Sequence, residues 1–487
     1  MLDKLKQLTK DTAVYGISTM LGRFLNFILV PFYTHVFLPA EYGVIGLVYL
    51  FMALMNIVFL YGMDSAYLKF QGMQEAEKKS KDNFSTPFIS VLLTSFLFCV
   101  LIILFKEPIF KVLEVPIEFS YLAYYVAGIL FLDAVAVIPF IVLRLERKAK
   151  TFAVFRVLNI LMNIFLNVYL IVFLKLGIEA VFISNLCASA LSIFLLFPEI
   201  FKKLKIKFDF ILFKKFLKFG LPYLPAGLAA MVIQVIDRYI LQAMTDLDTL
   251  GIYTANYKLG IFMMLFVNMF QFAWQPFFLQ NAKEKNAKEI FAKVLTYFTI
   301  IGSVILIILS LFIDDIIKIE FFGRTLIGNL YWGGVDIVPI ILLAYLFNGM
   351  YIIFLAGIYI KEKSSYAPLI TGLGALVNVI VNILLIPLMG IMGAAFATLA
   401  AYLTLAVGMF VVTQKFYRIE YEKWKITKIF FFIISIGGVY YYLFYEGDLN
   451  LIYKFLLLLA FVVLLYLFVF DKREIDFIKM NLRREKK

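Results

Sequence analysis

Apolar segments long enough to cross a lipid bilayer recur along the whole of this 487-residue chain. A transmembrane helix needs about 20 mostly apolar residues, because each residue adds about 1.5 Å and the hydrocarbon layer is about 30 Å thick. Charged residues make up only 16% of the chain, whereas soluble domains carry about 25%. The sequence therefore predicts an all-α integral membrane protein with about fourteen transmembrane helices. We place them at residues 12–36, 42–68, 84–105, 119–143, 151–174, 178–201, 214–243, 251–279, 291–313, 334–360, 365–388, 391–414, 427–445 and 449–470.

The net charge of +13 raises the question of an acidic partner such as nucleic acid. With the N-terminus placed inside, most of the 46 lysines and arginines fall in inner loops and tails, including the run within 202–218. Basic residues are enriched on the cytoplasmic side of membrane proteins. The charge thus predicts no nucleic-acid partner but a multi-pass protein of the cytoplasmic membrane with both termini cytoplasmic. The first segment is too long for the apolar region of a signal peptide, so we expect it to be retained.

The two halves of the chain repeat each other. Stretches from residues 15 and 219 share an aromatic-Gly start, one span, an acidic loop and a glycine with a tyrosine six positions later. Stretches from residues 163 and 378 share Asn-x3-Asn. Both matches align spans one to six with spans seven to twelve, and parallel repeats of this kind place the substrate path between the halves. The predicted domains are two six-helix lobes, 1–208 and 209–416, and a C-terminal part, 417–487, with two extra helices and a basic tail.

The seventh segment carries features that a lipid-facing helix avoids. Pro222 and Pro225 interrupt it, and the adjacent Asp237 and Arg238 charge it. A proline removes a backbone donor, and a charge at the bilayer centre costs about 2.5–3.5 kcal/mol. The prolines predict a bend near the inner end of the segment. Residues at helical spacing form a small, polar face that we expect to line a cavity: Tyr223, Gly227, Ala230, Gln234 and Asp237.

Arg23 lies near the middle of the first span, where its side chain cannot easily reach either surface, and Asn26 shares its helix face. We expect Arg23 to pair with Asp64 of the second span, with Asp133 of the fourth, or with an anionic substrate group. A guanidinium fork suits phosphate oxygens. The alternative is an interhelical ion pair that only positions helices.

Three further basic residues stand in the predicted spans. Arg238 and Lys258 lie within two turns of the outer surface, and Arg156 lies near the inner surface. Each is a candidate for substrate binding. Snorkelling to the nearby surface explains Arg238 and Lys258 equally well, and a role in topology explains Arg156.

Oxygen-bearing side chains of the second half form a candidate cation site. Asn378 and Asn382 are one helical turn apart, Thr398 follows in the next span, and Asp237 supplies a carboxylate. One carboxylate among neutral oxygens suits a monovalent cation better than a divalent one. The alternative is hydrogen bonding between helices, which polar side chains in membrane bundles commonly make.

Several activities find no support in the sequence. No Gly-x4-Gly-Lys-Ser/Thr motif occurs, so the chain is not itself an ATP-driven pump. We identify no catalytic residues and do not expect an enzyme. A membrane-embedded glycan-processing enzyme would have to use the acidic outer loop with Asp314, Asp315 and Asp336, which is a poor candidate.

Several motifs together resemble polysaccharide-type flippases of the multidrug/oligosaccharidyl-lipid/polysaccharide (MOP) exporter superfamily. They are Gly-x6-Arg at Gly16 and Arg23, the Pro-Ala-Glu-Tyr-Gly turn at 39–43, and Asn-x3-Asn followed by Gly-x2-Gly-Ala-Ala within 378–395. The similarity covers most of residues 8–416. It implies two lobes in a V around a cationic central cavity that opens to either side in turn.

The resemblance implies that the chain carries undecaprenyl-diphosphate-linked oligosaccharide across the cytoplasmic membrane for O-antigen, capsule or exopolysaccharide synthesis. Arg23 and Lys258 match positions expected to hold the diphosphate. Asn26, Arg156 and Arg238 are further candidates for substrate binding. Related lipid II flippases place a sodium ion between spans seven, eleven and twelve, where the candidate cation site falls.

No other cofactor is implied beyond Na⁺ or H⁺ as a coupling ion, with Asp64, Asp133 and Asp237 as coupling or counter-ion carboxylates. Expected partners are the polyprenyl-diphosphate-linked glycan, membrane lipids, a polysaccharide polymerase and chain-length proteins. A cation-coupled multidrug antiporter of the same superfamily is the nearest alternative.

Overall fold

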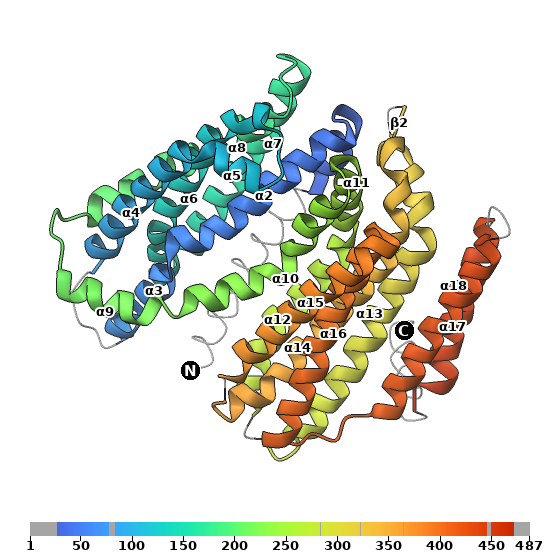
Figure 1. Ribbon diagram of the computed structural model, residues 1–487. Coiled ribbons are helices and arrows are strands. Elements are labelled where there is room, and N and C mark those ends of the chain that lie inside the picture. Colours follow the sequence, from blue (N-terminus) through green and yellow to red (C-terminus); the bar gives the residue numbers. More distant parts are fainter. Residues whose placement is uncertain are drawn as a thin grey trace, which may run out of the picture. The chain divides into compact units, whose positions relative to one another are not determined.

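The structure, a computed structural model, describes residues 27–76, 83–282, 284–321, 323–363, 365–445 and 450–471. Most of these residues are helical (Figure 1). A short apolar helix, Phe27–Val36, comes first. The α-helices that follow are α2 (Pro39–Leu60), α3 (Met63–Ala76), α4 (Ser85–Leu104), α5 (Lys106–Val112), α6 (Leu122–Leu145), α7 (Ala149–Val172), α8 (Glu179–Lys203), α9 (Phe210–Gly220), α10 (Tyr223–Met244), α11 (Leu247–Tyr257), α12 (Ile261–Asn281), α13 (Ala287–Lys318), α14 (Val338–Ile360), α15 (Tyr366–Met389), α16 (Ile391–Phe416), α17 (Lys423–Tyr445) and α18 (Leu451–Phe468).

Short 3-10 helices lie at Ile117–Tyr121, Lys258–Gly260 and Asn329–Ile337. A single antiparallel pair, β1 (Glu320–Phe321) and β2 (Arg324–Thr325), joins α13 to the last of them.

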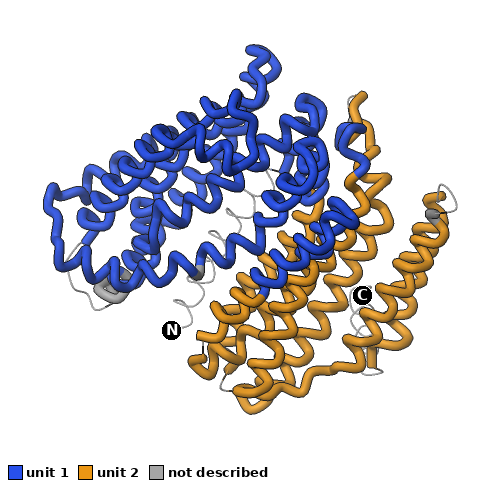
Figure 2. Tube along the Cα trace, in the orientation of Figure 1, with its two compact units in different colours: residues 1–258, 327–333, 374–398 blue, residues 259–326, 334–373, 399–487 orange. Residues whose placement is uncertain are grey.

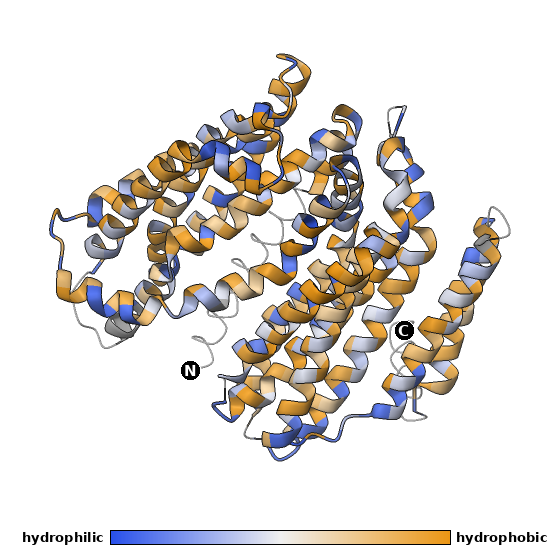
Figure 3. Cartoon of the chain, in the orientation of Figure 1, coloured by the Kyte–Doolittle hydropathy of each residue, from blue (hydrophilic) through white to orange (hydrophobic). Residues whose placement is uncertain are grey.

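Thirteen helical segments of the described residues are long and apolar enough to cross a membrane. Apolar residues cover these helices along their length, and hydrophilic residues gather toward their ends and in the loops (Figure 3). The first predicted span, 12–36, lies mostly outside the described residues, and the helix Phe27–Val36 is its C-terminal part. The all-α membrane fold is confirmed.

Two of the predicted spans are broken, and the breaks meet. The expected bend at the prolines is a full interruption, because α9 ends at Gly220 and α10 begins at Tyr223. The second span is interrupted where Gly62, with a φ of +78°, separates α2 from α3. A Cβ atom on Gly62 would overlap the carbonyl oxygen of Gly220. Backbone therefore lies directly on backbone here, and only glycine allows this approach.

The chain forms two compact units (Figure 2). Unit 1 comprises residues 1–258, 327–333 and 374–398, and unit 2 comprises residues 259–326, 334–373 and 399–487. The predicted domain boundaries, after residues 208 and 416, are placed by the sequence repeat and not by contacts. They stay a prediction.

Within unit 1, helices α2 and α11 pack against each other through glycines that the repeat aligns. A Cβ atom on Gly43 would overlap the carbonyl oxygen of Leu247, and one on Gly251 would overlap the carbonyl oxygen of Pro39. Both pairs, 43 with 251 and 39 with 247, are 208 positions apart in the sequence. The contact is therefore reciprocal across the repeat, and small residues let the two helix backbones touch.

Within unit 2, the C-terminal helix pair is attached to α13 by polar contacts. The buried ammonium of Lys454 on α18 lies 2.6 Å from a carboxylate oxygen of Asp315. The hydroxyl of Tyr440 on α17 donates a hydrogen bond of 3.2 Å to Asp314. Adjacent aspartates on α13 thus bind both C-terminal helices.

Candidate cation site and charged residues

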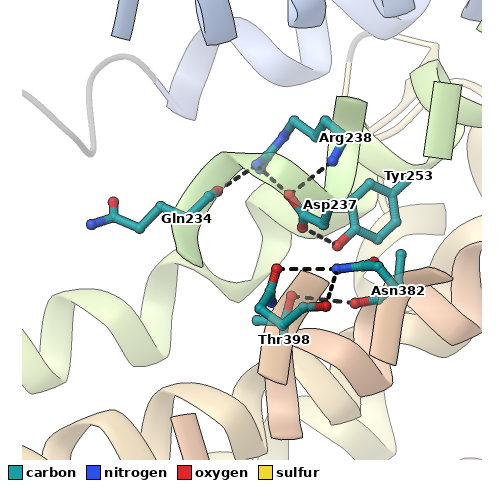
Figure 4. Close-up of polar contacts among 8 residues, drawn as sticks. Gln234, Asp237, Arg238, Tyr253, Asn382 and Thr398 are labelled. Carbon is teal, nitrogen blue, oxygen red and sulfur yellow. Dashed lines mark hydrogen bonds and ion pairs between the residues drawn. The ribbon is translucent and has the colours of Figure 1, made fainter. Parts of the chain in front are cut away.

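Asp237 is fully buried at the centre of the candidate cation site, on α10 of unit 1. The hydroxyl of Tyr253 on α11 donates a hydrogen bond of 2.5 Å to its Oδ2 atom. The guanidinium of Arg238 lies 3.3 Å from Oδ1 and also donates a hydrogen bond of 2.6 Å to the carbonyl oxygen of Gln234. The carboxylate is thus held from two sides (Figure 4).

The asparagine pair of α15 is also fully buried, and part of it has no partner. The Nδ2 atom of Asn382 donates hydrogen bonds of 2.8 and 3.1 Å to the carbonyl oxygen and Oδ1 of Asn378. Among the described residues, the Oδ1 atom of Asn382 receives no hydrogen bond. An unsatisfied buried acceptor costs about 1–3 kcal/mol, so this oxygen is open to a ligand, although the buried Nδ2 donor of Asn378 also has no partner among the described residues.

Thr398 completes the arrangement from α16. It is fully buried, its hydroxyl donates a hydrogen bond of 3.3 Å to the carbonyl oxygen of Ala394, and it also contacts the Tyr253 hydroxyl. Figure 4 shows Asp237, Asn382 and Thr398 close together. The donor set is one carboxylate with neutral amide and hydroxyl oxygens, which fits a hard monovalent cation. No group of three histidine, cysteine or acidic residues suited to a metal ion occurs in the described residues.

The first half of the chain repeats this arrangement with one decisive change. On α7, the Nδ2 atom of Asn167 bonds to Asn163 with the same two distances, 2.8 and 3.1 Å. Here, however, the hydroxyl of Tyr33 donates a hydrogen bond of 2.6 Å to Oδ1 of Asn167. Tyr33 precedes Asp237 by 204 positions, the offset at which the repeat begins. The first half thus pairs its amide oxygen with a hydroxyl donor, whereas the second half carries the carboxylate of Asp237 at the aligned sequence position.

The structure gives the remaining basic candidates separate surroundings within unit 1. The Nζ atom of Lys258 donates a hydrogen bond of 2.9 Å to the hydroxyl of Tyr42. The guanidinium carbon of Arg238 lies 4.4 Å from the ring centre of Tyr257. Arg238 is therefore shared between an aromatic face and Asp237.

Asp133 and Arg156 form a second polar cluster between α6, α7 and α8. The hydroxyl of Ser189 donates a hydrogen bond of 2.7 Å to Oδ1 of Asp133. Arg156 stabilises the charge of Asp133 electrostatically and stacks 4.2 Å from the ring centre of Phe140. Asp133 and Arg156 thus interact electrostatically within the same half, without an ion pair between them in the described residues.

Two expectations about charged side chains have no full structural account. Arg23 and Asn26 lie outside the described residues, so the pairing of Arg23 stays a prediction. Asp64 lies in the first turn of α3, where the hydroxyl of Ser65 donates a hydrogen bond of 3.5 Å to its carboxylate.

The face of α10 that the sequence assigns to a cavity is not uniform. Tyr223 and Gln234 are exposed, whereas Asp237 is buried against Tyr253, and Gly227 lies close to Ile57. Asp237 departs from the expected surface because α11 packs over it. The sequence reasoning also missed Tyr253, whose hydrogen bond to Asp237 depends on how α11 packs against α10.

Residues 8–282 match the family model of polysaccharide biosynthesis proteins. Among solved structures, the fold is similar to the lipid II flippase MurJ in an inward closed conformation, with a TM-score of 0.72, 18% identity, and 98% of this chain and 100% of that chain covered. It is also similar to a multidrug resistance MATE family transporter of the MOP superfamily in an inward-facing conformation, with a TM-score of 0.66, 15% identity, and 83% and 97% covered. No curated protein sequence matches. The family model covers more than half of the chain, and with these folds it confirms the resemblance: this chain belongs to the polysaccharide biosynthesis protein family.

Proposed function

We propose that this protein is a flippase that carries undecaprenyl-diphosphate-linked oligosaccharide across the cytoplasmic membrane by alternating access. The family match carries the proposal, because members named for polysaccharide biosynthesis need their lipid-linked units on the far side of the membrane. The fold shared with a lipid II flippase supports the same substrate class. The product serves O-antigen, capsule or exopolysaccharide assembly, with a polymerase and chain-length proteins as partners.

The physical problem is the diphosphate. Its negative charges cannot cross the hydrocarbon layer alone, because burying an isolated charge costs far more than a helix or lipid contact returns. In this proposal Arg23, Arg156, Arg238 and Lys258 bind the diphosphate, beside Asn26, while the polyprenyl tail stays in lipid. Tyr42 occupies only one of the three donors of the Lys258 ammonium, so two remain for phosphate oxygens.

A cation at Asp237 couples to transport through Arg238. In the absence of a cation, Arg238 pairs with Asp237, as the distance of 3.3 Å indicates. A Na⁺ ion or a proton on Asp237 would neutralise the carboxylate and weaken its hold on the guanidinium, which could then also bind the diphosphate. Loss of the cation would return Arg238 to Asp237 and favour release. Na⁺ is the better candidate, because it could bind to both Asp237 and the amide oxygen of Asn382. A proton would need Asp237 alone.

The test is transfer of labelled lipid-linked glycan in vesicles with imposed Na⁺ or H⁺ gradients. Asp237→Asn should abolish the dependence on the gradient, and Arg238→Gln should lower transfer in every gradient. Glu362→Gln, which changes an exposed carboxylate, serves as the control and should behave as the wild type. Gradient-dependent transfer that survives in Asp237→Asn would remove this residue from coupling, and no transfer of any lipid-linked glycan by the wild type would remove the flippase proposal.

The multidrug antiporter remains the second candidate, because the fold is shared with a MATE transporter and two aspartates, Asp133 and Asp237, lie within the helices of unit 1. Organic cations would bind to carboxylates rather than to arginines. Uptake of a fluorescent organic cation into vesicles, lost in Asp133→Asn, would favour the antiporter over the flippase.

A further inference from the structure

The connection between α8 and α10 presents a basic and apolar surface that none of the described residues covers. It consists of the loop 204–209 and helix α9, and we call it the α9 surface. Between residues 202 and 221 the only acidic residue is Asp209. Its carboxylate accepts hydrogen bonds of 3.0 Å from the backbone of Ile211 and Leu212, so it caps the helix. Asp209 therefore neutralises none of the neighbouring lysines through an ion pair.

The lysines of the α9 surface are exposed and unpaired with carboxylates. None of them forms an ion pair in the part of the chain that the structure describes; the set is Lys205, Lys207, Lys214, Lys215 and Lys218. In contrast, the nearby Lys203 and Lys148 both pair with Glu146. The surface thus concentrates positive charge that the protein itself does not balance.

Large apolar side chains alternate with these lysines. Ile206 is 99% exposed and Ile211 is 83% exposed, and Phe210 is 59% exposed. Lys214 lies 4.9 Å from the ring centre of Phe210, so the ring and the ammonium lie side by side on one face of α9. Isoleucines this exposed would be unfavourable in water. They match a helix that lies in the membrane interface, with its apolar side chains among the lipids and its ammonium groups among the headgroups.

The opposite face of α9 is fixed to the protein. The rings of Phe216 and Phe70 stack with centres 5.4 Å apart, which attaches α9 to α3. The backbone N–H of Lys205 donates a hydrogen bond to Ser85, and that of Asp209 donates one to Thr86. Figure 1 shows α9 beside α3 at one end of unit 1. The exposed face is therefore held in place and cannot turn inward to cover its isoleucines.

We propose that the α9 surface is a binding site for anionic phospholipid headgroups in the leaflet that the basic residues assign to the cytoplasm. Lysines near such a leaflet are attracted to its negative surface, and the alternation with isoleucine and phenylalanine anchors the helix at the depth of the headgroups. This binding site is independent of the substrate and of the cation site. Bound lipid would contact α9, and α9 ends at Gly220, where the backbone lies against that of Gly62. The lipid surface and the two helix breaks are therefore connected through α9.

The first test counts lipids bound to the full-length protein. The protein in detergent is titrated with phosphatidylglycerol or phosphatidylcholine, and bound lipid is measured by native mass spectrometry. In the variant Lys214→Gln/Lys215→Gln/Lys218→Gln, phosphatidylglycerol binding should weaken about 100-fold, since each lysine contributes about 1 kcal/mol and about 1.4 kcal/mol is a factor of ten. Phosphatidylcholine binding should not change.

A matched control removes three exposed lysines from unit 2, in the variant Lys361→Gln/Lys363→Gln/Lys415→Gln. Equal weakening in both triple variants, or none in either, would overturn the proposal. All six side chains are exposed, so both variants should elute from a sizing column as the wild type does.

The second test measures depth. A bimane probe is attached at Ile211→Cys, in a background where Cys99 and Cys187 are alanine, and the protein is reconstituted in vesicles. Spin-labelled lipids should quench the probe, and aqueous iodide should not. The protection from iodide should be stronger in vesicles with phosphatidylglycerol than in vesicles of phosphatidylcholine alone. Strong iodide quenching of equal extent in both kinds of vesicle would overturn the proposal. This is the result expected if the surface faces water and binds an acidic protein segment instead.

Discussion

A methyl group at position 251 would test the backbone contact between α2 and α11. The added Cβ of Gly251→Ala would overlap the carbonyl oxygen of Pro39, which belongs to a helix backbone and cannot rotate away. Overpacking of this kind costs about 1–3 kcal/mol, and we take the upper end because backbone must move. Replacing glycine by alanine inside a helix returns up to about 1 kcal/mol. The net destabilisation is therefore about 2 kcal/mol, which lowers the ratio of folded to unfolded protein about 30-fold.

The measurement is thermal unfolding in detergent, followed by the fraction of protein that still elutes as a monodisperse peak. Gly437→Ala on α17 is the control, because nothing lies within 4 Å of its added Cβ. It should be as stable as the wild type or more so. Gly43→Ala should resemble Gly251→Ala, and the double variant should lose less than the sum, since the first methyl group already separates the helices. A Gly251→Ala protein as stable as Gly437→Ala would refute the reciprocal contact.

Other perturbations test single interactions. Asp315→Ala should destabilise the protein by about 3–5 kcal/mol, because it leaves the buried ammonium of Lys454 unpaired. Lys454→Met should destabilise it less, since the Asp315 carboxylate is partly exposed to solvent. Thermal unfolding of the two variants measures the difference. Burial alone would raise the pKa of Glu146, but hydrogen bonds from lysines, Lys203 foremost, hold this pKa below its ordinary value. The ionised carboxylate therefore stabilises the folded protein at a pH above the ordinary pKa. This stabilisation is lost as the pH falls through the lowered pKa. Glu146→Gln should therefore flatten the decline in melting temperature on acidification, and an unchanged decline would contradict this. Na⁺ should raise the melting temperature of the wild type and leave that of Asn382→Leu unchanged, and an equal rise in both would exclude Asn382 as a ligand.

Much of the fold follows from local properties of the sequence. Helices are the only element that satisfies its own backbone in lipid, so a run of apolar residues of sufficient length already predicts a span. A bend near Pro222 follows from the missing backbone donor of proline, but the full interruption does not, because Pro139 lies inside the continuous helix α6. The common direction of Asn378 and Asn382 follows from their spacing of four, whatever helix lies next to them.

Contacts between distant helices follow from no such local rule. The sequence alignment related Gly43 to Gly251, but only the structure shows that the two helices touch at these glycines. The exposure of α9 depends on which face α3 covers.

By itself, the sequence determined the membrane class, the helical segments, the repeat and the residues that could hold a cation. Only the tertiary structure decided that Tyr253 bonds to Asp237 while the amide oxygen of Asn382 stays unpaired. The physical reason is that helical periodicity is a property of neighbouring residues, whereas a hydrogen bond between helices depends on how each helix is rotated and crossed against the next.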